Sequence, residues 1–258
     1  ERGAGDGAER GAAADLTTAD PTGTDRGAGA NETLAPGVTE SGVADADALA
    51  DAHDAALGER YEVDLDYREE YRRQRAFPRA GRYRTVAVAG SARYYERTRG
   101  WGDPAVAPIP TERRAVYGDG EYRYIRGPGE NATVADGLIW WPDTDSYASR
   151  SEMYIERFLD ARQTDVVETR VEDGRALHRV AVRGSADADV AAYSATAVVT
   201  DEGLVRELQV SYLRSDEEVA VSLLIRYDPS AGAVERPSWV PADTTNGSTE
   251  QPVGRYPD

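Results

Sequence analysis

Alternation of apolar and charged side chains is the feature that most restricts how this chain can fold. In segment 61–68 (YEVDLDYR) every second residue is Tyr, Val or Leu, and the residues between them are charged. Successive side chains of a strand point to opposite faces, so this segment predicts a strand with one buried and one solvated face. Similar segments at 82–89, 92–98, 113–126 and between 165 and 227 predict further antiparallel strands.

Short glycine-containing turns and two amphipathic segments complete the predicted secondary structure. Hairpin turns are expected at 118–120 (GDG), 172–174 (EDG) and 201–203 (DEG). One helix is predicted after Ser41 as N-cap and before Gly58, and a second over 149–162. The fold class is therefore α+β: a large antiparallel sheet of about eight to eleven strands that curls, with helices over its apolar concave face.

Two polar segments flank the predicted domain. Residues 1–33 contain almost no large apolar side chain, so they cannot bury enough surface to offset their ordering entropy. They are predicted to form a disordered acidic tether, 34–242 a single domain, and 243–258 a polar C-terminal tail. The chain has no apolar run of membrane-spanning length and no signal peptide at Glu1, so we expect a mature or trimmed product.

The charge composition indicates an extreme halophile. The formal net charge is −17, and every basic side chain is Arg, with no Lys. Acidic surfaces remain soluble in molar salt, where the Debye length falls to about 3 Å. An acidic mesophilic protein or a disordered acidic region would also explain the charge, but neither explains the absence of Lys. Such a charge argues against binding to nucleic acid, and the absence of Cys excludes disulfides and thiolate chemistry.

No catalytic motif is present in the sequence. We find no G-x-S-x-G elbow, H-E-x-x-H motif, phosphate-binding loop or dinucleotide fingerprint. The two histidines, His53 and His178, are far apart in sequence and do not supply metal-ligand spacing. Both are predicted to be packed imidazoles. We therefore expect no catalytic residue, no metal site, no cofactor and no enzymatic activity.

Arginine and aromatic residues are concentrated in one part of the chain. Between residues 60 and 126 Arg outnumbers Asp plus Glu, which predicts a basic face that includes Arg72, Arg73, Arg82 and Arg84. This face would suit anionic headgroups or an acidic glycan; the alternative is salt bridging to nearby carboxylates. The chain also holds 15 Tyr and four Trp against two Phe. Amphipathic rings suit a partly wet pocket; the alternative is that they fill the interface between sheet and helices.

Three N-x-[ST] sequons in predicted loops or tails are candidate glycosylation sites, at Asn31, Asn131 and Asn246.

Several segments, taken in order, carry a family resemblance. They are LAPGVTESGVADADALADAHDAAL (34–57), AVYGDGEYRYIRGPG (115–129), YIERFLDA (154–161), VEDGRALHRVAV (171–182), YSATAVVTDEGLVRELQVSY (193–212) and VERPSWV (234–240). The chain resembles haloarchaeal surface lipoproteins of unknown function, and through them the LolA and LppX type of lipoprotein fold. That resemblance implies a curved half-barrel covered by helices, with an apolar cavity for lipid. It also implies an N-terminal lipid anchor, whose Cys this chain lacks.

These observations predict a non-enzymatic, exported protein on the extracellular face of the cell membrane that binds a lipid or another apolar molecule. Its predicted cavity is lined by Val63, Leu65, Tyr83, Val86, Val88, Tyr122, Tyr124, Ile139 and Trp140. The alternative is a structural or interaction module of the halophilic cell envelope, with a filled core and no ligand. A hydrolase without a recognisable motif is a third hypothesis.

Overall fold

The structure is a computed structural model of the chain. It describes residues 32–71, 79–90, 92–102, 113–127, 133–136, 147–161, 163–184, 190–214, 219–230 and 233–241. Most of the predicted tether and the whole of the predicted C-terminal tail lie outside these ranges. The same is true of Arg72, Arg73, Ile139, Trp140, Asn31, Asn131 and Asn246.

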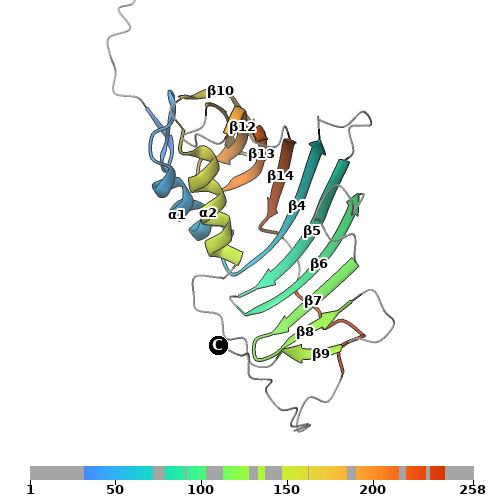
Figure 1. Cartoon of the computed structure of the whole chain (residues 1–258). Coiled ribbons are helices and arrows are strands. Elements are labelled where there is room, and N and C mark those ends of the chain that lie inside the picture. The colour runs from blue at the N-terminus through green and yellow to red at the C-terminus, as the bar shows by residue number, and fades with distance from the viewer. Residues whose placement is uncertain are drawn as a thin grey trace, which may run out of the picture. The chain divides into compact units, whose positions relative to one another are not determined.

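One antiparallel sheet of eleven strands dominates the described part of the chain (Figure 1). Its strand order is β10-β11-β12-β13-β14-β4-β5-β6-β7-β8-β9. The first half in sequence contains β4 (Arg60–Tyr71), β5 (Arg79–Ala89), β6 (Arg93–Gly102), β7 (Arg113–Asp119), β8 (Arg123–Arg126) and β9 (Thr133–Asp136). The second half contains β10 (Gln163–Glu172), β11 (Arg175–Arg183), β12 (Val190–Thr200), β13 (Val205–Arg214) and β14 (Val219–Asp228). The sheet is curved and does not close, because β9 and β10 remain at opposite edges.

Two helices accompany this sheet: α1 (Ala46–Leu57) and α2 (Tyr147–Leu159). They lie side by side next to the β10–β14 half, while β7–β9 extend away from them (Figure 1). Among the described residues, no helix is both long and apolar enough to cross a membrane. The predicted α+β class with one large curved antiparallel sheet and two helices is thus confirmed.

The predicted start of the first helix is wrong. Ser41 lies in the turn between two short strands, β2 (Val38–Thr39) and β3 (Gly42–Val43), which pair with β1 (Thr33–Ala35) in a small separate sheet. Asp45 is the N-cap, and its carboxylate accepts a hydrogen bond of 2.9 Å from the Ala48 N–H. Both Ser and Asp are good N-caps, so residue preference alone did not separate them.

The predicted hairpin at 172–174 is confirmed. Asp173 has φ 53° and Gly174 has φ 80°, so both residues of the two-residue loop are left-handed. Such a loop matches the right-handed twist of the strands β10 and β11 that it joins.

Strand register divides the sheet into two faces. The first, which we call the helix face, carries Tyr61, Val63, Leu65 and Tyr67 of β4 and packs toward α1 and α2. The second, the open face, carries Glu62, Asp64, Asp66 and Arg68. The main core lies on the helix face and includes Leu49, Leu57, Ile155, Leu159, Val86, Val180, Leu208 and Ile225.

Candidate functional site

The centre of the helix face is incompletely filled along β4. Val63 pairs across the sheet with Tyr227 on one side and Val86 on the other, and these neighbours are only 4% and 1% exposed. Val63 and Leu65 themselves are half-buried, although they lie on a central strand. Their remaining accessible surface is therefore not covered by the described side chains around them. Apolar surface is therefore available on the helix face at the middle of the sheet.

Four of the predicted cavity residues meet at this place. Val63 and Leu65 of β4 lie on the same face as Val86 and Val88 of β5, because Val63 pairs with Val86 and Tyr61 pairs with Val88. Val86 and Val88 are fully buried and belong to the main core together with residues of both helices. These four side chains form one apolar stripe across the two strands.

Tyr83 does not belong to this stripe. It lies an odd number of positions from Val86 and Val88, so the strand turns its ring to the open face. There it is 43% exposed, and its hydroxyl donates to Asp64 Oδ1 at 2.8 Å.

Tyr122 and Tyr124 also lie apart from the stripe. Tyr124 is buried against Tyr117, with ring centroids 6.1 Å apart, in a second small core on the open face. Val240 completes this core, and Tyr122 and Trp239 pack against it. The segment 233–241 after the last strand therefore covers part of β6–β8. Sequence analysis did not predict this packing.

Asp119 stabilises the turn beneath this second core. Its carboxylate accepts hydrogen bonds from the backbone N–H groups of Tyr122 at 2.7 Å and Glu121 at 2.9 Å, and from the Tyr124 hydroxyl at 3.2 Å. Burial acts to raise the pKa of Asp119, but these hydrogen bonds outweigh it and hold the pKa below its usual range. The tyrosines that were predicted to line a pocket are here structural.

A partly buried carboxylate, Glu96, lies on the helix face next to the apolar stripe. It accepts hydrogen bonds from the Tyr147 hydroxyl at 2.5 Å and the Thr98 hydroxyl at 2.7 Å, and Arg84 Nε lies 3.6 Å away. Burial acts to raise the pKa of Glu96, but Arg84 and the two hydroxyls hold it below its usual range. Because Tyr147 is the first residue of α2, Glu96 also fixes that helix to β6.

A second carboxylate, Glu69, lies farther along β4 on the same face and is buried. Its oxygens accept from the hydroxyls of Tyr67 and Tyr71, both at 2.6 Å, and from Arg214 at 3.0 Å. The helix face thus combines an apolar centre with polar groups at its margin. Sequence analysis missed Glu69 and Glu96, although their positions in the alternation place both on the buried side.

The predicted basic face is divided between described and undescribed residues. Arg82 and Arg84 lie on the helix face, where they pair across the sheet with Tyr67 and Leu65. Arg84 is close to Glu96, as the salt-bridge alternative anticipated. Arg72 and Arg73 lie outside the described residues, so their part in such a face remains a prediction.

Both histidines are buried among packed side chains. His53 of α1 is completely buried, and its Nδ1 accepts from the Val205 N–H at 3.1 Å, while its Nε2 has no hydrogen-bond partner. Its ring meets Tyr227 edge-on, with centroids 4.5 Å apart, and burial lowers the pKa of His53 to about 3. His178 Nδ1 lies 3.0 Å from the Thr169 hydroxyl. In the described part of the chain, no group of three metal-ligating side chains is found.

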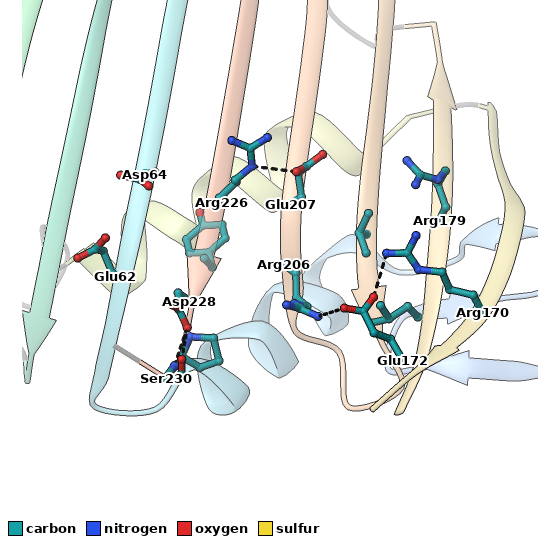
Figure 2. A pocket seen from close by; sticks show the side chains of 14 residues that line it. Glu62, Asp64, Arg170, Glu172, Arg179, Arg206, Glu207, Arg226, Asp228 and Ser230 are labelled. Carbon is teal, nitrogen blue, oxygen red and sulfur yellow. Dashed lines mark hydrogen bonds and ion pairs between the residues drawn. The ribbon is translucent and has the colours of Figure 1, made fainter. Parts of the chain in front are cut away.

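The open face carries a charged hollow of about 640 Å³ (Figure 2). Arg226 and Glu207 form an ion pair at 3.0 Å across it, and Arg170 pairs with Glu172 at 3.1 Å. Glu62 and Asp64 project into the same region from β4 (Figure 2). Two further hollows, of about 510 and 650 Å³, also include open-face residues of β4–β6. The hollow of about 640 Å³ is lined mainly by charged side chains, several of which pair with one another, so it offers little to an apolar ligand.

Comparison with known proteins gives structural likeness only. No protein-family model and no curated protein sequence matches the chain. Among solved structures, the chain is similar to LprF from Mycobacterium bovis, with 10% identity over 76% of this chain and 99% of that one, at a TM-score of 0.40. It is also similar to the lipoprotein LppX from Mycobacterium tuberculosis, with 10% identity over 74% and 98% of the two chains, at 0.28. A LolA superfamily protein from Nitrosomonas europaea shows 8% identity over 71% and 92%, also at 0.28. At such TM-scores the likeness carries no information about ligand or activity.

Proposed function

We propose that this protein binds a lipid-like or other apolar molecule on the helix face of its sheet, without catalysing a reaction. The observation that carries the proposal is the half-burial of Val63 and Leu65 at the centre of the sheet, beside the fully buried Val86, Tyr227 and Ile225. Burying apolar surface stabilises a complex by about 25 cal/mol per Å². A hydrocarbon chain laid along this stripe would remove that remaining surface from water.

The proposed setting is the outside of a halophilic cell. The net charge of −17 without Lys supports a protein that works in molar salt. In this proposal residues 1–33 are a spacer from an N-terminal membrane anchor, and Asn31, Asn131 and Asn246 are candidate glycosylation sites. A surface lipoprotein in a haloarchaeal envelope fits these features together.

A filling variant tests the proposal. Leu65→Trp places a larger side chain in the space beside the stripe, so it should weaken binding of a fluorescent fatty acid at least about tenfold. Tyr83→Trp is the matched control, because it introduces the same side chain on the neighbouring strand but on the open face. Binding is followed by fluorescence in molar KCl, and native mass spectrometry of protein from its own host tests for retained lipid.

The two measurements have opposite outcomes for the two functional hypotheses. Equal binding by Leu65→Trp and wild type would show that the ligand does not bind at the apolar stripe. No lipid mass and no probe binding would favour the interaction module instead. One observation supports that second candidate: β10 is an edge strand on which Val167 and Val171 are 54% and 73% exposed. An exposed edge strand can pair with another chain.

A further inference from the structure

Strand register places arginine directly beside the apolar stripe. On the helix face, Leu65 of β4 pairs with Arg84 of β5, Arg84 pairs with Thr98 of β6, and Thr98 pairs with Arg114 of β7. Directly opposed side chains in an antiparallel pair have Cβ atoms about 5 Å apart. One row across the sheet thus passes from an apolar side chain to two guanidinium groups.

The helix face of β5–β8 is strongly basic within an acidic protein. Its described strand residues include four arginines and one carboxylate, Glu96; the arginines are Arg82, Arg84, Arg114 and Arg123. Arg150 of α2 adds a further positive charge and lies 5.1 Å from the centre of the Tyr147 ring. The open face of the same strands also carries arginines, so what distinguishes this group within the described residues is that it shares a face with the apolar stripe.

Two observations describe the surroundings of these arginines. Burial raises the pKa of the Tyr94 hydroxyl, and Arg123, Arg150 and Arg114 all oppose that rise, so all three are close to it. Arg84 Nε is buried and has no hydrogen-bond partner, since its distance of 3.6 Å to Glu96 is too long for a hydrogen bond. A buried guanidinium N–H without an acceptor is costly, and an incoming anion would supply that acceptor.

We infer that the ligand is an anionic amphiphile, whose headgroup binds Arg84 and Arg114 while its apolar chain lies against Val63 and Leu65. This inference rests on the proposed function and adds the chemical class of the ligand. Arg82 and Arg123 flank the headgroup position. Long-range attraction is screened within about 3 Å in molar salt, so the anion must contact the guanidinium groups directly. Phosphate and sulfate oxygens match the planar donor pattern of Arg.

Two lipids with the same chain test the inference. Oleoyl lysophosphatidate and monooleoylglycerol differ in the phosphate group, and inorganic phosphate serves as the headgroup alone. Wild-type protein in molar KCl should bind the lysophosphatidate at least about tenfold more tightly than the neutral lipid, as measured by displacement of a fluorescent probe. Inorganic phosphate alone should bind far more weakly than the lysophosphatidate.

Neighbouring arginines provide a matched pair of variants. Arg114→Gln removes a charge from the helix face, whereas Arg113→Gln removes one from the open face of the same strand. Arg114→Gln and Arg84→Gln should each lower the ratio of lysophosphatidate affinity to monooleoylglycerol affinity several-fold. Arg113→Gln should keep the wild-type ratio. Arg114 is exposed, so its replacement keeps the test independent of folding.

Each contrary outcome has a distinct meaning. If wild type binds both lipids equally, the inference is overturned and the proposed function survives. If phosphate alone binds as tightly as the lysophosphatidate, the arginines form a free-anion site and the amphiphile is excluded. If neither lipid binds, the proposed function itself fails.

Discussion

His53 makes the stability of the protein depend on pH in a way that one variant can isolate. Its imidazole is completely buried and accepts a hydrogen bond from the Val205 N–H, so the folded protein holds it in the neutral form. Burial lowers the pKa of His53 from 6.5 to about 3. Between these two values the unfolded chain binds a proton that the folded chain does not, so folding stability falls as the pH falls.

The magnitude follows from the two pKa values. At about pH 7.5 both states are neutral, and His53 contributes no pH dependence. At about pH 5 the unfolded imidazole is protonated while the folded one is not, and the pH lies about 1.5 units below the unfolded pKa. Each unit corresponds to about 1.4 kcal/mol, so His53 should lower the free energy of unfolding by about 2 kcal/mol between these conditions.

Urea unfolding of wild type and His53→Asn at the two pH values, at one fixed KCl concentration, measures this contribution. Asn keeps an acceptor for the Val205 N–H but does not titrate, so its stability should fall by about 2 kcal/mol less than that of wild type. Other titrating groups contribute equally to both proteins and cancel in the difference. His53→Leu also removes the acceptor, and should lose stability at both pH values. An identical pH effect in wild type and His53→Asn would refute a buried neutral imidazole.

Two further predictions concern stability. Glu69→Ala removes the common acceptor of Tyr67, Tyr71 and Arg214 and should lower the free energy of unfolding in urea by about 3–5 kcal/mol. Glu70→Ala breaks only an exposed pair with Arg79 and should lower it by less than about 1 kcal/mol. Similar losses in the two variants would contradict a buried network around Glu69. Gly42→Ala should lower the melting temperature by several degrees, because Gly42 has φ 116° and a Cβ there would lie 2.3 Å from Thr164 Oγ1; an unchanged melting temperature would show that β3 moves freely away from β10.

Sequence patterns predicted the strands well because alternation acts within a single strand. The alternating apolar residues of β4, from Tyr61 to Tyr67, could be assigned to one face from the sequence alone. The structure places that face toward the helices. The same rule separates Tyr83 from Val86, since they differ by three positions in one strand. Grouping them as one lining set overlooked that parity.

Contacts between distant segments could not be predicted in this way. The pairing of β4 with β14 and the packing of Val240 on Tyr117 and Tyr124 depend on how far-apart segments meet. Local pattern carries no information on such partners. The alternation places Glu69 and Glu96 on the helix face, but it could not supply their hydroxyl donors, which come partly from other elements, such as Tyr147 of α2.

The junction of β4 with β14 bears on how the protein folds during synthesis. Tyr71 pairs with Val219, so the first long strand waits for the last one before the middle of the sheet can form. Contacts between residues so distant along the chain carry a large loop-closure entropy and slow folding. Until that junction closes, both sides of it expose unpaired strand edges, which favour association with other chains. An emerging chain of this protein is therefore most vulnerable to misassembly late in translation, when ten of the eleven strands described in the large sheet are already made.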